Sequence, residues 1–348
     1  MNKNTDWRPG FLGEYVGQAP LVKELAVEIV GSKQQQRPLN SMVFHGPGGL
    51  GKTTLCEIIA AERGLPPPIF LIGKACSHEY LTQVLGGLQS EGYDQKGFLV
   101  APSAATYPIV VVDEAESVET ELWELLHPAL ESDASGRRIM LGKEVIGRQP
   151  PKRWPIWLVH FTLIAITNFY GKLLQRAPAT MTRFPIKYQF NFYSDGEIGQ
   201  VARQYAGKLG VSITDEAIAM LSTRCHGVPR AAVQYVRRAQ DFLGTQGAIN
   251  RLVMAKMFEV IGIDDNGLDQ AQITYMKSLI NIGNGRLGIE ALASILSSDR
   301  QTLECAIEPP LLRKGLVVRT AGGREITSAG RVLVCGKTAA SPLYTRAI

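Results

Sequence analysis

The feature that most constrains this chain is a glycine-rich segment near its amino end. Residues 46–53 read G-P-G-G-L-G-K-T, follow the apolar run 42–44 and open the helical stretch 54–62. In a strand–loop–helix context, backbone N–H groups face phosphate oxygens, a lysine neutralises them and a threonine hydroxyl coordinates Mg²⁺. The alternative, an ordinary glycine turn before a helix, requires neither Lys52 nor Thr53. The segment therefore predicts a nucleotide-phosphate site formed by Gly46, Pro47, Gly48, Gly49, Leu50, Gly51, Lys52, Thr53 and Thr54.

Acidic side chains end a second apolar run. Residues 109–112 are β-branched without alternation, as in a strand buried on both faces of a parallel sheet, and Asp113 and Glu114 follow directly. In a nucleotide-binding sheet, the first carboxylate holds the water shell of Mg²⁺ and the second orients and deprotonates the attacking water. Loop solvation is the other explanation for an acidic pair. Together with the phosphate loop, the pair favours hydrolysis over binding alone.

Two further runs complete the predicted sheet. Residues 161–166 form a continuous apolar strand that ends in Thr167 and Asn168, and residues 186–192 alternate between apolar and polar. Because such strands alternate with helical segments, we expect a parallel α/β domain whose polar strand ends meet where the γ-phosphate would lie.

Composition indicates an ordinary globular protein. The chain has 348 residues, of which 45% are hydrophobic and 20% charged, enough for two or three compact domains. We find no long apolar span and no signal-peptide pattern, so we expect a cytoplasmic protein that does not bind a membrane. The five cysteines are scattered without a C-x-x-C pair, which favours buried apolar thiols over disulfides or a zinc site.

Positive charge concentrates toward the carboxyl end. The formal net charge is +5 and the isoelectric point is about 8.9, which permits a polyanionic partner without demanding one. From residue 266 onward, ten Lys and Arg stand against six Asp and Glu. This segment therefore carries most of the excess charge.

The pattern changes twice along the chain, which predicts three domains and a tail. The α/β pattern covers residues 1–192, and S-D-G-E at 194–197 is a capping box that opens an all-helical domain over 193–262. Over 263–340, three helical segments precede two short strands joined by a glycine turn. This is the pattern of a winged helix, which presents one helix to a DNA groove and a hairpin to the backbone. Residues 341–348 form the tail.

Taken together, these motifs resemble the AAA+ ATPases, and within them the RuvB family of Holliday-junction branch-migration motors, over residues 8–336. R-P-G-F-L-G-E-Y-V-G-Q at 8–18 is similar to the family's R-P-x-x-L-x-E-Y-[IV]-G-Q, which packs around adenine. Without the phosphate loop, Tyr15 is more simply a core aromatic residue. The resemblance implies an adenine site that includes Arg8, Pro9, Tyr15 and Val16.

Two segments resemble the family's sensors of the γ-phosphate. F-T-L-I-A-I-T-N at 161–168 is similar to F-T-L-I-x-x-T-x, which implies that Asn168, with Thr167 beside it, reads this phosphate. G-V-P-R at 227–230 resembles G-T-P-R, which implies that Arg230 touches the same phosphate from the helical domain.

Arg183 resembles the family's arginine finger. Arg183-Phe184 matches the end of P-L-R-D-R-F, whose last arginine enters the neighbouring subunit's site and stabilises transition-state charge. The match is incomplete, because Met181 and Thr182 stand where the family has Arg-Asp. A solvated charge before a strand is the other explanation for Arg183.

Blocks in the last domain separate this family from clamp loaders and replication initiators. G-L-D, L-G-I-E-A-L-A, T-L-E and E-P occur in the family's order, and R-T-A-G-G-R at 319–324 resembles its wing block R-T-P-R-G-R. The resemblance implies that Arg319 and Arg324 contact DNA phosphates. A solvated basic hairpin is the alternative.

Other departures bear on catalysis and on partners. Gly48 replaces a proline, which a glycine-rich turn tolerates. D-E-A-E-S-V at 113–118 lacks the His and Arg of the family's D-E-I-H-R-L. Residues 139–151 fall where the family projects a hairpin that grips its partner RuvA, and only I-M-L-G-K at 139–143 is similar. This segment is either a partner anchor, which we favour, or folds back on the sheet.

The resemblance implies an ATP-hydrolysing motor that binds Mg·ATP, forms a homohexameric ring and moves four-way-junction DNA, with a RuvA-like partner at 139–151. Two other hypotheses stay open. One is an AAA+ loader or initiator that uses ATP only to assemble on DNA, and the other is a nucleotide-dependent scaffold whose winged helix binds protein. ATPase stimulation by branched DNA favours the motor, ATP-gated binding with slow turnover favours the loader, and absence of salt-sensitive DNA binding favours the scaffold.

Overall fold

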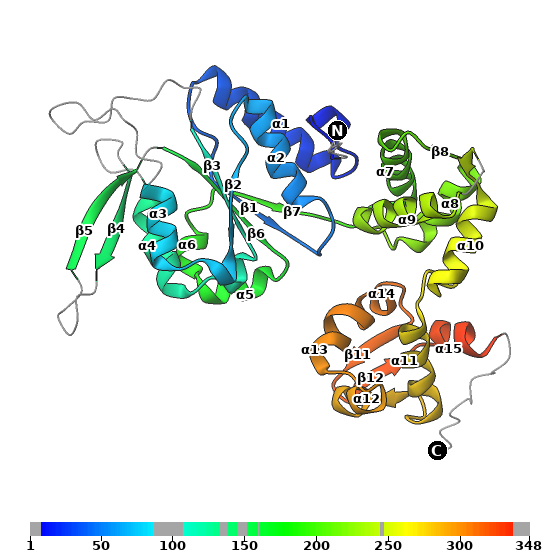
Figure 1. The fold of residues 1–348 in the computed structure, drawn as a ribbon. Coiled ribbons are helices and arrows are strands. Elements are labelled where there is room, and N and C mark those ends of the chain that lie inside the picture. Colours follow the sequence, from blue (N-terminus) through cyan, green and yellow to red (C-terminus); the bar gives the residue numbers. More distant parts are fainter. Residues whose placement is uncertain are drawn as a thin grey trace, which may run out of the picture. The chain divides into compact units, whose positions relative to one another are not determined.

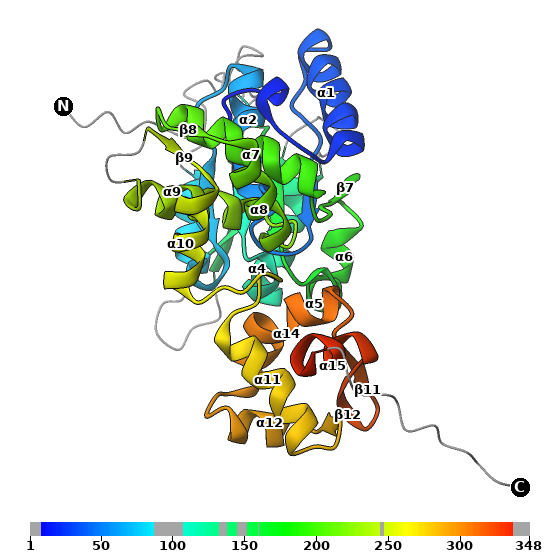
Figure 2. The ribbon, with the colours of Figure 1, turned by 90° about the vertical axis from the view of Figure 1, so that its right-hand side faces the viewer.

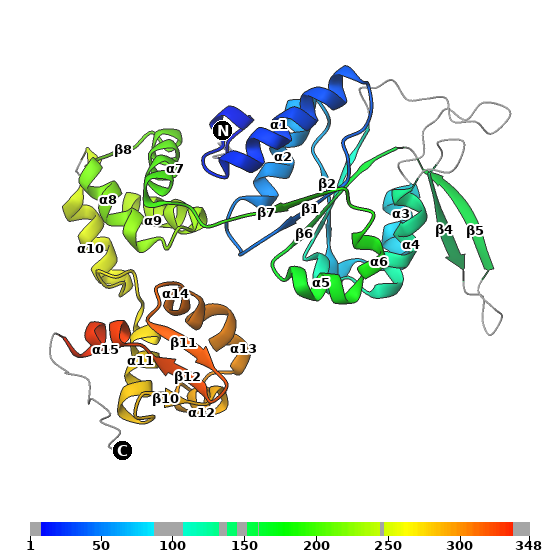
Figure 3. The same ribbon diagram turned by 180° about the vertical axis from the view of Figure 1, so that it is seen from behind.

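The computed structural model describes residues 8–86, 107–131, 138–144, 152–158, 160–243 and 247–336. The chain forms two compact units (Figures 1, 2 and 3), the first comprising Met1–Gly210 and Gly227–Gln234 and the second Val211–His226 and Tyr235–Ile348. A unit boundary falls within the predicted helical domain 193–262, and the division into three domains stays a prediction. The predicted tail, residues 341–348, lies outside the described residues.

A five-stranded sheet forms the centre of the first unit. In spatial order its strands are β2 (Ile69–Ile72), β3 (Ile109–Asp113), β6 (Thr162–Thr167), β1 (Met42–His45) and β7 (Ile186–Gln189). Every neighbouring pair runs parallel, which confirms the predicted α/β domain. Because the strands share one direction, the carboxyl ends of β1, β3 and β6 meet at one edge of the sheet.

Helices cover both faces of this sheet (Figures 1 and 3). One side carries α1 (Ala19–Gln34) and α2 (Lys52–Arg63), and the other carries α3 (His78–Gly86), α4 (Thr120–Leu130), α5 (Tyr170–Arg176) and α6 (Pro178–Met181). Successive strand residues point to opposite faces, so Val110 and Val112 pack in the core on the α3–α6 side while Val111 is buried on the other face. Burial on both faces explains why β3 lacks alternation.

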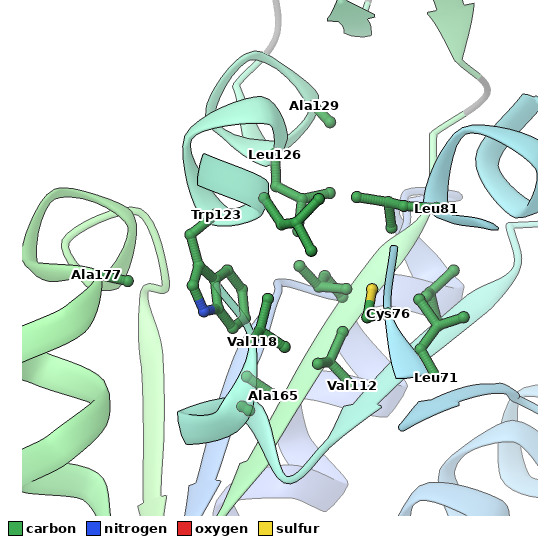
Figure 4. Close-up of a cluster of buried hydrophobic side chains, with 14 of the residues drawn as sticks. Leu71, Cys76, Leu81, Val112, Val118, Trp123, Leu126, Ala129, Ala165 and Ala177 are labelled. Carbon is green, nitrogen blue, oxygen red and sulfur yellow. The ribbon is translucent and has the colours of Figure 1, made fainter. Parts of the chain in front are cut away.

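Trp123 of α4 is central to the core on the α3–α6 side. Figure 4 shows its ring among Val118, Leu126 and Ala165. It is fully buried and stands edge-on to Phe184, with ring centroids 6.5 Å apart.

A separate two-stranded ribbon leaves the α3–α4 side of the unit. β4 (Arg138–Glu144) and β5 (Lys152–Leu158) pair antiparallel and belong to no larger sheet among the described strands. β4 lies against α4 and β5 against α3, so these helices separate the ribbon from the five-stranded sheet (Figures 1 and 3). The predicted hairpin at 139–151 thus includes a strand that does not fold back on the sheet, while 145–151 lie outside the described residues.

The predicted capping box after β7 is confirmed. Ser194 Oγ accepts the Glu197 N–H at 3.3 Å, and Glu197 Oε2 accepts the Ser194 N–H at 2.7 Å. These two bonds satisfy N–H groups that have no partner within the helix, and they fix the start of α7 (Asp195–Lys208).

The second unit begins with helices and a short strand pair. α8 (Asp215–Arg224) packs with α10 (Arg251–Ile261), and β8 (Ser212–Ile213) runs parallel to β9 (Ala248–Ile249). The sequence predicted helices only, because two-residue strands leave no pattern. α9 (Pro229–Asp241) begins in the first unit and ends in the second.

Arg224 ties these helices to the segment that follows them. Its buried guanidinium donates to the Asp264 carbonyl oxygen at 3.0 Å and pairs with Asp265 at 2.5 Å. It also lies 4.8 Å from the ring centre of Phe258, a distance for cation–π attraction. One side chain therefore fixes the connection between α10 and the last part of the unit.

That last part is a winged helix, as the sequence predicts. Its elements are α11 (Gln270–Asn281), β10 (Arg286–Leu287), α12 (Ile289–Ile295), α13 (Arg300–Thr302), the π-helical turn Leu303–Ile307, α14 (Glu308–Arg313), β11 (Val317–Thr320), β12 (Gly323–Ile326) and α15 (Ser328–Cys335). The wing is a three-stranded sheet in the order β10-β12-β11. The sequence missed β10 and α15.

Two expectations from composition have mixed outcomes. Cys56, Cys76 and Cys225 are buried, but Cys305 and Cys335 are exposed, so the prediction of buried thiols is wrong for these two. Within the described ranges, no helix combines the length and the apolar character that crossing a bilayer requires.

We expect Trp123→Ala to lower the free energy of unfolding by about 3–5 kcal/mol, because it removes a fully buried large aromatic ring. Urea denaturation followed by circular dichroism measures the change. Tyr80→Ala is the matched control, since that ring is 41% exposed. A Trp123→Ala protein as stable as the control would contradict the central place of this ring in the core.

Candidate functional site

The phosphate loop joins β1 to α2 at the carboxyl edge of the sheet. Gly46 has a φ of 137°, and a Cβ there would stand 2.5 Å from the Phe190 carbonyl oxygen. Gly51, the N-cap of α2, has a φ of 93°, and its Cβ would stand 2.6 Å from the Tyr15 hydroxyl. Both positions therefore require glycine. The helix N-terminus behind the loop favours a bound anion.

Lys52 is buried within this loop, with 6% of its surface exposed. Its Nζ donates to the carbonyl oxygens of Gly46 and Pro47, both at 2.7 Å, and to Asn168 Oδ1 at 2.9 Å. Burial lowers the pKa of Lys52 to about 8, against the opposing effect of the Asp113 carboxylate. The ammonium thus joins the loop to the end of β6, and a phosphate oxygen can replace its present acceptors.

The acidic pair ends β3 with a sharp turn. Thr53 Oγ1 donates to Asp113 Oδ2 at 3.4 Å, and Asp113 Oδ1 accepts the Glu114 N–H at 2.9 Å. Glu114 is exposed and has a left-handed φ of 52°. Gly73 lies against this turn, because the Glu114 carbonyl oxygen occupies the place where a Cβ on Gly73 would stand. One carboxylate therefore faces the phosphate loop and the other lies just beyond it in solvent.

Thr53 and Asp113 fit a Mg²⁺ ion that a nucleotide carries. Among the described residues, no three His, Cys, Asp or Glu side chains form a metal cluster. Mg²⁺ is usually held by one or two protein oxygens, with phosphates and water completing its shell. The hydroxyl of Thr53 and the carboxylate of Asp113 are such a pair.

The two predicted sensor residues at the end of β6, Thr167 and Asn168, make different contacts. Thr167 is 1% exposed, its Oγ1 accepts the Phe169 N–H at 3.0 Å and its carbonyl oxygen accepts the Gly46 N–H at 3.3 Å. Asn168 instead places its amide oxygen on the Lys52 ammonium. The geometry favours Asn168 as the group beside a γ-phosphate, whereas Thr167 holds the loop against the sheet.

Sequence reasoning missed two aromatic residues at this edge. His45 ends β1 and Tyr170 begins α5, and their rings stack with centroids 4.3 Å apart and an interplanar angle of 13°. Burial, followed by the charge of Lys52, lowers the pKa of His45. The imidazole is therefore mainly neutral at pH 7. No local signal predicts this stack, because it depends on how β1 and β6 are placed side by side.

Two tyrosines contact the phosphate loop at the Leu50 carbonyl oxygen. The hydroxyls of Tyr15 and Tyr193 lie 3.3 Å and 3.2 Å from the Leu50 carbonyl oxygen and 3.3 Å from each other. Burial raises the pKa of Tyr193 to about 12, so the phenol stays neutral and donates to the backbone. Tyr193 was not predicted, since nothing in the sequence distinguishes it from the alternating residues before it.

The other residues of the predicted adenine site lie on one segment, which contacts α2. Arg8 pairs with Glu57 of α2, and Lys208 Nζ donates to the Arg8 carbonyl oxygen at 2.8 Å. Pro9 and Val16 are half-buried. The structure therefore places this segment against α2, and its contact with adenine stays a prediction.

Arg230 reaches the phosphate loop from the start of α9. Its N–H donates to the Gly49 carbonyl oxygen at 3.3 Å, and a Cβ on Gly49 would stand 2.8 Å from Val228 and 3.2 Å from the Arg230 side chain. The charge of Arg230 is also one cause of the lowered pKa of Lys52. A bound polyanion would relieve this repulsion between cations.

Arg183 lies away from these residues in its own chain. It precedes β7, whose first residue Ile186 pairs beside Met42 at the start of β1, whereas the phosphate loop follows the end of β1. Its Nη1 donates to the Ala179 carbonyl oxygen at 2.6 Å and its Nε lies 2.8 Å from Glu131 Oε1. The arginine thus occupies the amino edge of the sheet, opposite the loop.

A buried carboxylate binds both predicted wing arginines. Glu308 is fully buried and accepts Arg319 Nε at 2.8 Å and Arg324 Nε at 2.9 Å, while the Tyr275 hydroxyl donates to it at 2.9 Å. Arg324 also pairs with Glu304 at 2.8 Å, and its side chain is 11% exposed compared with 47% for Arg319. Phosphate contact by either arginine stays a prediction, and the geometry favours Arg319.

We expect the stability of the nucleotide-free protein, relative to Lys52→Met, to rise between pH 8 and pH 10. The folded state lowers the pKa of Lys52 to about 8. The unfolded chain, with a pKa near 10.4, therefore binds more protons over this interval and is disfavoured as pH rises. The expected gain is on the order of 3 kcal/mol.

Urea denaturation at several pH values measures this difference, and Lys187→Met on the exposed surface of β7 is the control. A stability difference that stays flat from pH 8 to pH 10 would show that Lys52 is not desolvated.

Comparisons with known proteins agree with this geometry. Family models match successive parts of the chain: the Holliday junction DNA helicase RuvB P-loop domain at residues 7–69, the ATPase family associated with various cellular activities (AAA) at 42–192, the RuvB AAA lid domain at 193–264 and the RuvB C-terminal winged helix domain at 265–334.

Individual relatives match over nearly the whole chain. The Holliday junction branch migration complex subunit RuvB of Paramagnetospirillum magneticum is 31% identical over 93% of this chain and 87% of its own length, and that of Desulfosudis oleivorans is 32% identical over 92% and 88%. The Thermotoga maritima RuvB Holliday junction branch migration motor has a TM-score of 0.76 at 26% identity and covers 96% of this chain and 99% of that one. The chain therefore belongs to the RuvB family of AAA ATPases.

Proposed function

We propose that this protein is an ATP-driven motor that moves four-way-junction DNA and works as a homohexameric ring. The observation that carries the proposal is the gathering of Lys52, Thr53, Asp113, Asn168 and Arg230 at one sheet edge, in a chain that also carries a winged helix. Relatives of this chain are named as subunits of a Holliday junction branch migration complex.

When a nucleotide binds, its phosphate oxygens replace the present hydrogen-bond acceptors of Lys52. In the free site the ammonium donates to two carbonyl oxygens and to Asn168. Phosphate oxygens carry more negative charge, so they compete for this donor and raise its pKa again. The adenine base would lie against Tyr15 and Val16, with Tyr193 holding the loop from the same side.

Hydrolysis uses the two carboxylates differently. Asp113 and Thr53 would hold a Mg²⁺ ion that arrives with the nucleotide, and the ion would supply positive charge toward the phosphates. Glu114 is exposed just past the strand end and accepts the proton of the attacking water. Asn168 Oδ1 already accepts a hydrogen bond from Lys52, so it lies where the γ-phosphate and its water would be oriented.

Arg183 completes the site of a neighbouring subunit. At the amino edge of the sheet it lies at the opposite end of the strands from the phosphate loop of its own chain. A ring in which each amino edge meets the next subunit's carboxyl edge brings this charge to the transferred phosphate. The ion pair with Glu131 is the contact that Arg183 would leave.

α9 transmits the state of the nucleotide. Its first turn carries Arg230, while its last turns belong to the unit that contains the winged helix. Loss of the γ-phosphate removes the anion that Arg230 binds, so α9 changes its hold on the loop and the winged helix moves with it. Phosphate contacts position such a motor without reading bases.

The β4–β5 ribbon would bind a RuvA-like partner. Its two strands pair with each other and with no other described strand, which leaves their outer edges available to a second protein. The place of the ribbon in the chain is also where the resemblance puts the partner hairpin.

We expect the wild-type protein to separate the arms of a synthetic four-way junction in the presence of ATP and Mg²⁺, measured by gel electrophoresis with and without a RuvA-type protein. Glu114→Gln should bind ATP normally and hydrolyse it roughly 10²-fold or more slowly, because a general base is lost. Lys52→Ala should lose ATP binding. Glu119→Gln, which changes an exposed carboxylate at the start of α4, is the control.

Each result decides between hypotheses. Normal turnover by Glu114→Gln would exclude Glu114 as the base. ATP-gated DNA binding without arm separation would identify a loader, and absence of salt-sensitive DNA binding would identify a scaffold.

We expect Arg183→Ala to keep its nucleotide affinity and to lose on the order of 10³-fold in hydrolysis, the effect of a missing arginine finger. Mixing it with Lys52→Ala should restore part of the activity, since an intact loop and an intact finger then meet at some interfaces. Lys187→Ala, an exposed cation on β7, is the control. If native mass spectrometry shows mixed rings but no activity returns, Arg183 does not act in trans.

A further inference from the structure

The charges of the two expected wing arginines are already balanced inside the wing. Arg319 and Arg324 stand opposite each other in the β11–β12 register and share the buried carboxylate of Glu308. Glu304 pairs with Arg324 as a second partner. Moving Arg324 onto a DNA phosphate would leave a fully buried carboxylate short of its partner, which is strongly unfavourable. A DNA phosphate would therefore have to compete with Glu308 and Glu304 for Arg324, whose contact with DNA stays a prediction.

A third arginine lies at the wing turn without such a balance. Arg286 is on β10, directly opposite Glu325 of β12, and is exposed. Its guanidinium does not stay beside that strand pair but reaches the turn between β11 and β12. A Cβ on Gly322 would stand 3.0 Å from Arg286 Nη1 and 3.2 Å from its Cζ. Within residues 247–336, no carboxylate lies within salt-bridge distance of this guanidinium.

The sequence of the turn differs from the family block at the position that Arg286 reaches. R-T-A-G-G-R at 319–324 aligns with the block R-T-P-R-G-R, so Gly322 stands where the block has its second arginine. The turn therefore has no arginine side chain at position 322, where the block has one. Arg286 brings a guanidinium group to the same place from β10. Two residues far apart in sequence are thus alternative sources of one charge.

We propose that Arg286 is the phosphate-binding residue of the wing turn. The inference rests on the proposed DNA function and adds the residue through which the wing holds the DNA backbone. A guanidinium offers several donors in a plane that matches phosphate oxygens, and an exposed one keeps these donors available. Such a contact releases a counterion and is insensitive to base sequence.

The first test is the salt dependence of binding to a four-way junction in the intact protein. We expect Arg286→Ala to lower the slope of log K against log salt by about 0.9 for every wing that contacts DNA, and to do so for junctions of any sequence. Arg286→Lys, which keeps the charge, should retain most of the slope. Lys256→Ala removes an exposed charge from α10, outside the wing, and should keep the wild-type slope.

A second variant places the charge back on the turn. Gly322 does not have a left-handed φ, and the atoms nearest to its added Cβ are those of Arg286 itself. Arg286→Ala therefore makes room for an arginine at 322, and Arg286→Ala/Gly322→Arg should recover the wild-type slope. A merely structural role of Arg286 would not be restored by a side chain attached at another position.

Wild-type affinity and slope in Arg286→Ala would overturn the proposal. Loss of slope in the single variant without recovery in the double variant would overturn the placement of the contact at the turn. If the wild-type protein itself shows no salt-dependent binding, the proposed DNA function fails, and this inference fails with it.

Discussion

The site depends on one desolvated cation. Lys52 is buried under the phosphate loop, and its three acceptors come from the loop and from the end of β6. Because little water surrounds the ammonium, its charge acts strongly on any anion that enters. The parallel order of the strands supplies the rest, since it places Asp113 beside Thr53 and the amino-edge Arg183 beyond reach. The positions of the phosphate site and of Arg183 thus both follow from the same sheet.

The sequence predicted the parts of the site that depend on local order. The phosphate loop, the strand before Asp113 and the strand before Asn168 carry their own patterns, so their places at a common edge follow once the sheet is parallel. Tyr193 and the His45–Tyr170 stack could not be predicted, because each is defined by a neighbour from another strand or helix. The choice of Asn168 over Thr167 also needed the structure, since side-chain direction at a strand end is not written in the motif.

The wing shows the same limit for charge. Arg319 and Arg324 cannot be distinguished in the sequence. In the structure both pair with the buried Glu308, yet the Arg319 side chain is much more exposed than that of Arg324. Burial of an acidic residue on a short helix has no local signal. β10 is too short to leave a pattern, so the arrival of Arg286 at the turn was also invisible. Basic residues can be counted from a sequence, but only packing tells which of them are already neutralised.

Gly73 constrains the site from the 3-10 turn that follows β2, a strand that carries none of the site's motifs. Any side chain there meets the Glu114 carbonyl oxygen, so it pushes on the left-handed turn that positions the proposed base. Such a change leaves Lys52 and its loop in place. Variation at position 73 would therefore separate nucleotide binding from hydrolysis, because the phosphate loop would still fill while the proposed base is displaced. A glycine that takes no part in catalysis can in this way limit the rate of hydrolysis.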